Sequence, residues 1–440
     1  MKLTSGAKIL IDKLLNSGYE AYAVGGAVRD FLLGREITDT DITTLASPNE
    51  MLEVFSGLKT YPSGLKHGTI TVLIGGESIE VTTFREDIGY TDFRRPDNVK
   101  FVKSLNEDLK RRDFTMNAIA YNDTLGFIDP YNGLEDIKNK VIRAVGEPNC
   151  RFQEDALRIL RALRFSSQLD FEIEENTKRA IIENCELLKK VSVERIYGEL
   201  LKLLIGKGVE RVLLEFKQVI FTIIPELKDC DGFLQKSKYH AYDVYTHIVK
   251  SVALSCQDKI TRLSLLFHDI GKPKCFSLDS DGVGHFYGHQ KISAEMTYNI
   301  LKRFKADNAT ISEVCKIIEL HDSKTELSRY EVKKFLNKHG FDFLTKLINV
   351  KKGDSLSHAT GYINNRLESL QNMYNTAKDV IDKKECFTLK YLKINGNDLK
   401  NAGYKGQEIK NKLDKILNDV MALKLENNRE VLLKEIKNDR

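Results

Sequence analysis

The sequence predicts an α+β fold in which an N-terminal mixed sheet with helices is followed by helices alone. Two observations lead to this class. Short runs with β-branched residues at period two, bounded by Gly and Pro, all lie within the first 145 residues. From about residue 147 onward the strand signal fades, and long patterns at helical spacing replace it. We therefore expect four parts, with boundaries at 1–142, 143–215, 216–360 and 361–440.

The expected strands are short, namely Tyr22–Val24, Thr69–Ile74, Ile79–Thr83 and Val99–Val102. The N-terminus places charges inside an apolar pattern, which predicts an amphipathic helix and not a signal peptide. The later helices are expected at Phe152–Phe165, Glu175–Lys190, Val193–Ile205 and Lys259–Asp269. The last 80 residues are expected to be helical as well, broken by a Gly-containing turn around Asn395–Gly406.

Composition excludes several classes of protein. The chain has 440 residues, of which 42% are hydrophobic and 30% charged, as is ordinary for a soluble globular protein. Its apolar runs fall far short of the roughly 20 residues that a membrane span needs. The seven cysteines form no C-x-x-C pair, so we expect reduced thiols in the cytoplasm. A net charge of +5 is too small to establish a nucleic-acid partner by itself.

The most informative stretch is AYAVGGAVRDFLLGREITDTDI, residues 21–42. A short apolar strand runs into Gly25 and Gly26, and a helical segment carrying Arg29 follows. Glycines let the backbone approach a phosphate, and the amides at a helix start point toward an anion. Many strand-to-helix turns contain glycine for steric reasons only, so the turn alone does not decide between these interpretations.

The same stretch ends in a D-x-D pattern. If Asp39–Thr43 is a strand, Asp39 and Asp41 project to one face, about 6–7 Å apart. Two carboxylates this close repel each other unless a cation lies between them. Mg²⁺ is bound by carboxylates and substrate phosphates, and two such ions about 4 Å apart serve in-line phosphoryl displacement. Glu80 is a candidate third carboxylate, or else an exposed strand residue.

A second constellation lies in RFQEDALRILRALRF, Arg151–Phe165, which we expect to be one helix. On such a helix Asp155 and Arg158 are i,i+3 neighbours. Arg161 is rotated by a further 60° and Arg164 lies opposite Asp155, so no single basic face is expected. An intrahelical ion pair on a solvated face is the simpler interpretation.

The functional interpretation rests on the chemistry of base edges. A carboxylate accepts from an exocyclic amino group, and a guanidinium donates to ring or carbonyl acceptors. Asp155 with Arg158 therefore complements the Watson–Crick edge of cytosine or adenine. Uracil and guanine present an oxygen where the carboxylate needs a donor, which leaves a desolvated carboxylate facing an acceptor. This pair would select CTP and ATP without a nucleic-acid template.

Three motifs resemble the class II tRNA nucleotidyltransferase and bacterial poly(A) polymerase family: GGAVRDFLLG…TDTDI, RRDFTMNA and EDALRILR. The resemblance implies a polymerase-β-like head over 1–142 and a helical neck over 143–215. It implies that Asp39 and Asp41, with Glu80 as a further candidate, are catalytic and that the two aspartates bind Mg²⁺. The nucleotide would be bound by Gly25, Gly26, Arg29, Arg112, Asp155, Arg158, Arg161 and Arg164.

Histidines and carboxylates recur in the order H…HD…D between residues 247 and 354. Imidazole and carboxylate ligands suit Ni²⁺, Mn²⁺, Fe²⁺ or Zn²⁺. The pattern resembles an HD phosphohydrolase domain, which many members of this nucleotidyltransferase family carry, and the part 216–360 is identified with it. The resemblance implies His247, His268, Asp269 and Asp354 as ligands, with His289 and His321 as further candidates. A degenerate domain kept for tRNA docking is the alternative.

Two further segments complete the resemblance. Residues 85–96 resemble the flexible loop of enzymes that add adenosine. In the tail, 361–440, glycines alternate with lysines over Lys393–Leu413, a pattern that suits phosphate contact or an ordinary solvated surface. The resemblance favours contact with tRNA.

The predicted function is the addition of CCA to tRNA from CTP and ATP, with Mg²⁺. The alternatives are a poly(A) polymerase or A-adding enzyme, a metal-dependent phosphohydrolase acting on phosphomonoesters or 2′,3′-cyclic phosphates, and an RNA-binding factor with an inactive head. Partners other than tRNA and these nucleotides are not indicated, and no membrane association is expected.

Overall fold

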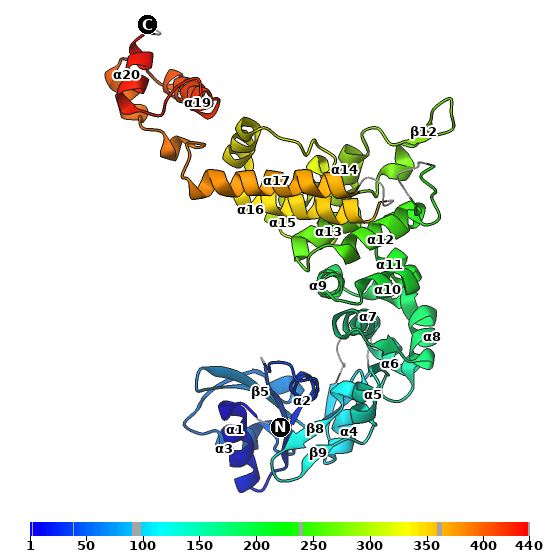
Figure 1. The fold of residues 1–440 in the computed structure, drawn as a ribbon. Helices are drawn as coiled ribbons and strands as arrows, with labels where there is room; N and C mark the ends of the chain where they lie inside the picture. Colours follow the sequence, from blue (N-terminus) through cyan, green and yellow to red (C-terminus); the bar gives the residue numbers. More distant parts are fainter. Residues whose placement is uncertain (2, 38, 90–97, 237–240, 359–362, 439–440) are drawn as a thin grey trace. The chain divides into compact units, whose positions relative to one another are not determined.

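The computed structural model describes residues 1–440 except 2, 38, 90–97, 237–240, 359–362 and 439–440. The chain forms two compact units, Met1–Glu226 and Leu227–Arg440. The strands of the main sheet, coloured blue to cyan in Figure 1, occur only in the first unit, whereas helices dominate the second. The α+β class is therefore confirmed. The four boundaries predicted from the sequence stay predictions, since the chain divides here into two units.

The first unit is built on a seven-stranded mixed sheet with the order β3-β4-β5-β2-β1-β8-β9. Neighbouring strands are antiparallel except β2 and β5, which run parallel. All four residues of the interior strand β1 are buried, as an apolar run predicts. The strands are β1 Ala21–Val24, β2 Asp41–Thr44, β3 Lys59–Gly64, β4 Thr69–Ile74, β5 Glu77–Thr83, β8 Ala120–Asn122 and β9 Gly126–Ile128.

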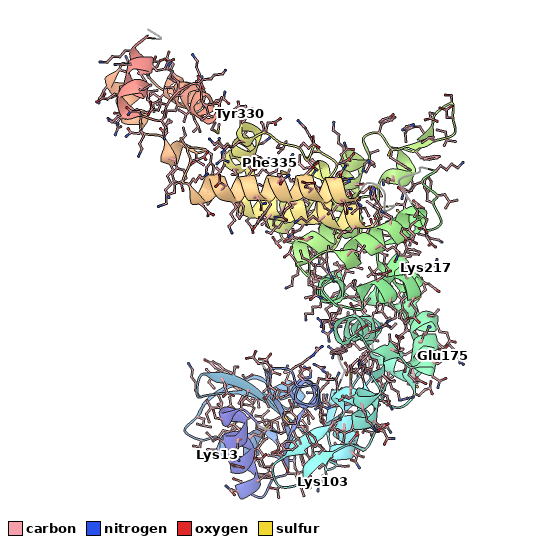
Figure 2. All side chains as sticks on the ribbon, in the orientation of Figure 1. Lys13, Lys103, Glu175, Lys217, Tyr330 and Phe335 are labelled. Atoms are coloured by element: carbon pink, nitrogen blue, oxygen red, sulfur yellow. The ribbon has the colours of Figure 1, made fainter. Side chains whose placement is uncertain are left out.

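Short helices accompany this sheet. The predicted N-terminal helix is α1, capped by the Thr4 hydroxyl, and it buries one apolar face, including Leu10 and Leu14, while Lys13 projects outward (Figure 2). A capping box between Ser47 and Glu50 starts α3. The helices of this part are α1 Ser5–Asn16, α2 Gly26–Leu32, α3 Pro48–Val54, α4 Leu105–Lys110 and α5 Gly133–Lys138.

The prediction of a loop over residues 85–96 is wrong in its first part. Arg85–Ile88 forms β6, which pairs antiparallel with β7, Asn98–Phe101, in a separate two-stranded sheet. Backbone pairing of Arg85 with Phe101 and of Asp87 with Val99 fixes this register. Residues 90–96 lie outside the described residues.

Helices follow the sheet, as predicted, with one short parallel pairing of β10 to β11. The segment expected as one helix over Arg151–Phe165 is two helices with a break at Asp155. The helix expected at Glu175–Lys190 ends at Asn184 and continues as a 3₁₀ turn. The elements are β10 Val141–Ile142, α6 Pro148–Glu154, α7 Leu157–Leu169, β11 Glu172–Ile173, α8 Glu175–Asn184, α9 Val193–Leu204, α10 Val209–Glu215 and α11 Lys217–Ile223.

The second unit packs α12 and α13 against the long helix α16, and α14 against α15. A small hairpin joins α13 to α14. Helix α16 contains a kink at Gly340, whose φ of 80° only glycine adopts readily. The elements are α12 Val244–Leu254, α13 Lys259–Phe267, β12 Ser277–Leu278, β13 Gly284–His285, α14 His289–Arg303, α15 Asn308–Leu320, α16 Arg329–Leu356 and α17 Ile363–Asp382.

A separate apolar cluster holds the C-terminal helices together. Tyr330, labelled in Figure 2, lies at the start of α16 and packs against this cluster. Its hydroxyl donates to the Asn418 Oδ1 atom at 2.6 Å. The turn expected around Asn395–Gly406 contains a helix, α18 Gly396–Asn401, because Asn395 and Asp398 form a capping box. The remaining helices are α19 Gln407–Met421 and α20 Arg429–Asn438. Among all the helices described, none combines the length and the apolar character needed to span a membrane.

Candidate active site and a histidine–aspartate cluster

A cavity of about 750 Å³ lies in the first unit, between the sheet and helices α7 and α9. The sheet side and the helical side both contribute to its wall. Almost every nucleotide-site residue predicted from the sequence lines it: Gly25, Gly26, Arg29, Asp39, Asp41, Arg112, Asp155, Arg158, Arg161 and Arg164. Two motifs more than a hundred residues apart are thereby brought to one place.

The glycine turn places the backbone beside the acidic pair. Val24, the last residue of β1, pairs with Asp41, the first residue of β2, so Gly25 follows directly at the edge of the cavity. Gly25 has a φ of 72°, and a Cβ there would lie 3.2 Å from the Arg112 Nη1 atom. Glycine is therefore favoured by the backbone conformation, and a Cβ there would also crowd the Arg112 guanidinium.

Asp39 does not belong to a strand, which corrects the expectation of an Asp39–Thr43 strand; β2 begins at Asp41. Both side chains still line the cavity. Loss of water around its carboxylate is the main cause that raises the pKa of Asp41, an effect that Arg112 opposes and Asp39 reinforces. The pair is therefore arranged so that a cation would relieve it.

Glu80 is exposed on β5, next to this pair. Ile42 pairs in register with Val81 in the parallel β2–β5 ladder, so Asp41 and Glu80 precede that pair and share one face of the sheet. Glu80 is not among the residues that line the cavity. Its role as a third catalytic carboxylate stays a prediction.

A fully buried carboxylate, Asp108, orders the arginines behind the acidic pair. Asp108 lies 2.9 Å from Arg111 and 3.4 Å from Arg112, and it accepts the Thr43 hydroxyl of β2 at 3.1 Å. Burial alone would raise the pKa of Asp108, but the two guanidinium groups overcome it and hold the pKa below its usual range. Arg112 is thereby fixed between Asp108 and Asp41.

The break between α6 and α7 changes how Asp155 is presented. The residue ends α6 in an extended conformation, with φ −135° and ψ 101°, and its Oδ1 atom accepts from the Leu157 amide at 3.0 Å. Its Oδ2 atom accepts from Arg195 Nη2 of α9 at 3.0 Å. Arg164 lines the same cavity as Asp155 and Arg158, so the prediction that it lies opposite Asp155 is wrong. The helical rotation does not carry across the break.

Arg158 is held by three acceptors. Its Nη1 atom donates to Glu154 at 2.7 Å and to the Arg151 carbonyl at 3.2 Å, and its Nη2 atom donates to the Arg111 carbonyl at 2.9 Å. A guanidinium has five N–H donors, so two of them, on Nε and Nη2, remain for a ligand. The solvated Asp155–Arg158 ion pair that was the simpler expectation is not formed; each residue has another partner.

The other two arginines of α7 that line the cavity, Arg161 and Arg164, are also paired. Arg161 donates through Nε to Asp113 Oδ2 at 2.8 Å, and Arg164 lies 3.2 Å from Glu199. Although burial opposes it, Arg161 lowers the pKa of Asp113 far below the usual range of a carboxyl. Asp113 thus stays charged and connects the sheet side of the cavity to α7.

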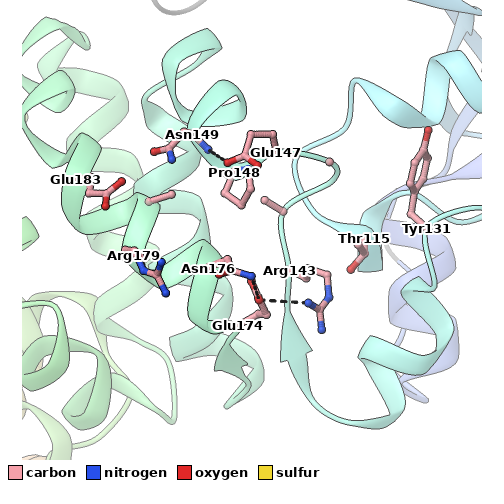
Figure 3. A pocket seen from close by; sticks show the side chains of 13 residues that line it. Thr115, Tyr131, Arg143, Glu147, Pro148, Asn149, Glu174, Asn176, Arg179 and Glu183 are labelled. Atoms are coloured by element: carbon pink, nitrogen blue, oxygen red, sulfur yellow. Dashed lines mark hydrogen bonds and ion pairs between the residues drawn. The ribbon is translucent and has the colours of Figure 1, made fainter.

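A second hollow of about 470 Å³ also lies in the first unit (Figure 3). It lies where the part built on the seven-stranded sheet, hereafter the sheet domain, meets α6 and α8. Arg143 lies there 3.4 Å from Glu174. Acidic and basic side chains alternate around it, with Glu147, Glu183 and Arg179 among them. It contains no residue predicted as functional, so the chemistry of the first unit is concentrated in the larger cavity.

The second unit brings together the six predicted ligands His247, His268, Asp269, His289, His321 and Asp354, hereafter the histidine–aspartate cluster. All six are buried. They come from five helices: α12, the ends of α13 and α15, the start of α14, and α16. Gly353 permits this approach, because a Cβ there would lie 2.8 Å from Leu265 and 2.9 Å from the Ser251 carbonyl.

The ring nitrogens of the cluster are oriented toward a common centre. Three histidines donate through Nδ1 to backbone carbonyls at 2.6–2.9 Å, namely His268, His289 and His321. A carbonyl only accepts, so in the neutral ring the Nε2 atom carries a lone pair. Yet the Nε2 atoms of His289 and His321 face each other at 3.2 Å. Opposed lone pairs beside two carboxylates form a donor set that could hold a transition-metal ion.

The pKa values of two histidines in the cluster are shifted in opposite directions. Burial alone would lower the pKa of His268, but Asp269 and Asp354 overcome it and raise the pKa to about 10. Burial and the neighbouring His268 lower the pKa of His321 to about 3. The centre therefore attracts one positive charge strongly and rejects a second proton on the adjacent ring.

Several residues of both sites escaped the sequence analysis. In the cavity these are Asp113, Phe165 and Arg195, which depend on partners dozens of residues away. Around the cluster they are Lys272, His358 and Arg366, which lie 2.7–3.1 Å from Asp269 or Asp354. The H-D-x-x-K spacing could have indicated Lys272, and the i,i+4 spacing from Asp354 could have indicated His358; nothing in the sequence indicates Arg366.

Family models match three segments of the chain. The poly A polymerase head domain matches residues 21–143, and the model described as "Probable RNA and SrmB- binding site of polymerase A" matches residues 170–230. The tRNA nucleotidyltransferase domain 2 model matches residues 285–436. The first match contains the glycine turn and the acidic pair, and the third contains part of the histidine–aspartate cluster.

Some known proteins resemble the whole chain, and others resemble about half of it. A CCA-adding enzyme of Ligilactobacillus salivarius is 37% identical over 435 residues, which cover 97% of this chain and 95% of that protein. One of Lactobacillus helveticus is 57% identical over 197 residues, so the matched segment spans only 49% of that relative's length. The crystal structure of the Bacillus stearothermophilus CCA-adding enzyme in complex with CTP superposes with a TM-score of 0.69 at 32% identity, covering 100% of this chain and 98% of that one.

Proposed function

This chain belongs to the family of CCA-adding enzymes, and on that premise we propose that it adds C and A nucleotides to the 3′ end of tRNA. One observation carries the proposal. A single cavity combines an acidic pair with arginines and with a carboxylate–guanidinium pair suited to reading a base. The Bacillus stearothermophilus relative was crystallised in complex with CTP, which is one of the two nucleotide substrates proposed here.

Each group in the cavity has a distinct role in this proposal. Asp39 and Asp41 would bind Mg²⁺, which when bound neutralises phosphate charge and lowers the pKa of an attacking hydroxyl. Arg29 and Arg112 would hold the triphosphate, and the Gly25–Gly26 backbone would admit it. Catalysis would then consist mainly of positioning and charge neutralisation. Glu80 remains a proposed third carboxylate on the adjoining strand.

Asp155 and Arg158 would select the base. Each oxygen of Asp155 has one hydrogen bond to the protein, and a second lone pair on each remains for an exocyclic amino group. Arg158 retains two donors for ring or carbonyl acceptors of the base. Cytosine and adenine satisfy both residues, whereas uracil and guanine present an oxygen to the carboxylate.

The test uses three tRNA transcripts: one that ends before CCA, one that ends in CC, and one that is complete. Each is incubated with Mg²⁺ and labelled CTP, ATP or both, and product lengths are measured on a denaturing gel. The proposal expects three, one and no added nucleotides. Tails longer than three nucleotides would indicate a poly(A) polymerase, and activity on the CC transcript alone would indicate an A-adding enzyme.

Arg195 is expected to support base selection through its contact with Asp155. Its Nη1 atom is buried and, among the described residues, makes no hydrogen bond, so Asp155 is the partner that Arg195 orients. Replacing Arg195 with methionine keeps the unbranched stem but frees the carboxylate to rotate. We expect the preference for CTP over UTP, measured as the ratio of kcat/KM, to fall about tenfold. Arg211→Met, an ion-paired arginine of α10 away from the cavity, is the matched control.

A second activity is favoured by the donor set of the histidine–aspartate cluster. We propose that the cluster binds Mn²⁺, Ni²⁺, Fe²⁺ or Zn²⁺ and that the bound metal, by activating water, supports hydrolysis of phosphomonoesters or 2′,3′-cyclic phosphates. Two ligand triads, one with Asp354 and one with Asp269, offer room for two ions. A location in the cytoplasm is part of the same proposal, on the ground that all seven cysteines are free.

Metal binding at the cluster is expected to be measurable without any substrate. After incubation with Mn²⁺ or Ni²⁺ and dialysis, elemental analysis should find one to two ions per wild-type chain. His268→Ala should remove at least one of them, because it deletes the imidazole nitrogen that lies close to both Asp269 and Asp354. His285→Ala, at a partly exposed histidine paired with Asp279, should leave the metal content unchanged. Equal metal content in wild type and His268→Ala would refute the assignment, and hydrolysis of 2′,3′-cyclic AMP is then assayed with the loaded chain.

A further inference from the structure

One aromatic ring in the cavity is surrounded by cations. Phe165 of α7 is 6% exposed, and its ring centroid lies 4.1 Å from the guanidinium carbon of Arg164, 4.9 Å from that of Arg29 and 5.6 Å from that of Arg161. Phe114 contacts the same ring edge-on at 5.8 Å. Two of the cations come from the same helix as Phe165, and Arg29 comes from α2 of the sheet domain.

Each of these arginines has its own carboxylate. Arg29 lies 2.8 Å from Asp30, and the partners of Arg161 and Arg164 are Asp113 and Glu199. The carboxylates do not cancel the repulsion among three neighbouring guanidinium groups. Burial lowers the pKa of Arg164, and the charges of Arg161 and Arg29 lower it further while Glu199 opposes the shift.

The ring offers what a further carboxylate could not. An aromatic face attracts a cation without occupying its N–H groups, so the donors stay available. Among the described residues, no hydrogen bond is made by the Arg161 Nη1 atom or by the Arg164 Nη2 atom. Arg29 uses Nε, Nη1 and Nη2 toward Asp30 and Asn117, and one N–H on Nη1 remains. The three arginines around Phe165 are thus charged, fixed and rich in unused N–H donors.

We propose that Phe165 is a positioning residue whose ring holds Arg29, Arg161 and Arg164 in place as a preformed anion site for the triphosphate of the incoming nucleotide. The inference rests on the proposed function for the identity of the anion. A preformed site avoids the cost of gathering three mutually repelling side chains when the nucleotide binds. The same ring joins an arginine of the sheet domain to two of α7, so it also fixes the distance between them.

This role differs from that of an ordinary core residue. Held arginines would bind substrate and transition state alike, so their loss should raise KM and leave kcat nearly unchanged. Phe165→Leu removes the ring and keeps an apolar side chain, whereas Phe165→Tyr keeps the ring. Phe152→Leu, at a fully buried phenylalanine of α6 that does not line the cavity, controls for loss of packing alone.

The experiment measures the Kd of CTP and of ATP with Mg²⁺ in the absence of tRNA, and then KM and kcat with a tRNA lacking CCA. For Phe165→Leu we expect Kd and KM to rise about tenfold and kcat to change less than about threefold. Phe165→Tyr should stay within about threefold of wild type. Thermal unfolding checks each variant, and Phe165→Met replaces the leucine variant if that one does not fold.

Three results would overturn the proposal: wild-type Kd in Phe165→Leu, an equal loss in Phe165→Tyr, or the same loss in Phe152→Leu. Failure of the proposed function is distinguishable from these. In that case the wild-type chain adds no nucleotide to tRNA, while the ratio of variant to wild-type Kd still reports on the ring.

Discussion

Replacing Asp41 with asparagine is expected to lower nucleotide incorporation by about a thousandfold or more, because a metal ligand at the reacting phosphate is lost. Asparagine has nearly the same shape and keeps one oxygen, but it removes the charge that Mg²⁺ requires. The measurement is single-turnover incorporation of labelled CTP into a tRNA that lacks CCA. Asp123→Asn, at an exposed aspartate of the sheet domain that pairs with Lys8, is the control and should retain wild-type activity.

The same variant should not lose stability. The pKa of Asp41 is raised in the folded chain, so its charge is less favourable there than in the unfolded chain. A raised pKa means that the carboxyl group stabilises the folded chain while it is protonated. This contribution to the free energy of unfolding is fully present below the pKa of the unfolded chain, and it is lost as the pH rises through the raised pKa of the folded chain. At neutral pH asparagine removes an unfavourable charge, and the melting temperature should stay equal or rise.

Wild-type incorporation by Asp41→Asn would refute the metal role; lost activity with a lowered melting temperature would leave the loss attributable to misfolding.

Replacing Asp155 with asparagine is expected to relax base selection by about a hundredfold, the range in which a mismatched buried polar group is rejected. A carboxylate only accepts hydrogen bonds, whereas an amide accepts through its oxygen and donates through its nitrogen. The amide can therefore turn its nitrogen toward O4 of uracil. The measured quantity is kcat/KM for CTP divided by that for UTP on the same tRNA.

The control for this variant lies at the other end of α7. Asp170 ends the helix with a φ of 57°, a conformation that asparagine tolerates, and it does not line the cavity. Asp170→Asn should leave selectivity unchanged. If Asp155→Asn discriminates against UTP as strongly as wild type does, the carboxylate does not read the base, and selection must arise elsewhere in the cavity.

Local patterns in the sequence predicted four of the strands, namely β1, β4, β5 and β7. Period-two segments such as Thr69–Ile74 became strands within about two residues, because burial of alternate side chains is a local property. The fold class, the glycine turn and the acidic pair could likewise be predicted from the sequence. Asp39 lies outside β2 because the partner strand β1 ends at Val24, which pairs with Asp41, and this pairing depends on residues far away in the sequence.

The break at Asp155 shows where local reasoning failed. The run EDALRIL lacks Gly and Pro and reads as continuous helix. Asp ahead of an apolar run is also a start signal, and here its carboxylate accepts from the Leu157 amide and from Arg195 forty residues later. The ion pair with Arg195 and the hydrogen bond from the Leu157 amide together stabilise the break more than one further turn of helix would stabilise a continuous helix. The order of histidines and aspartates indicated all six residues of the histidine–aspartate cluster, with His289 and His321 as further candidates, and their role as metal ligands stays a prediction.

The most direct measurement of metal and nucleotide binding is anomalous diffraction from crystals of the chain grown with Mn²⁺ and CTP. We predict anomalous peaks between the Asp39 and Asp41 oxygens and the triphosphate, about 4 Å apart if two ions bind, with the cytosine amino group facing Asp155. A bound CTP whose phosphates lie away from both aspartates, with no peak beside them, would contradict the proposed role of the acidic pair.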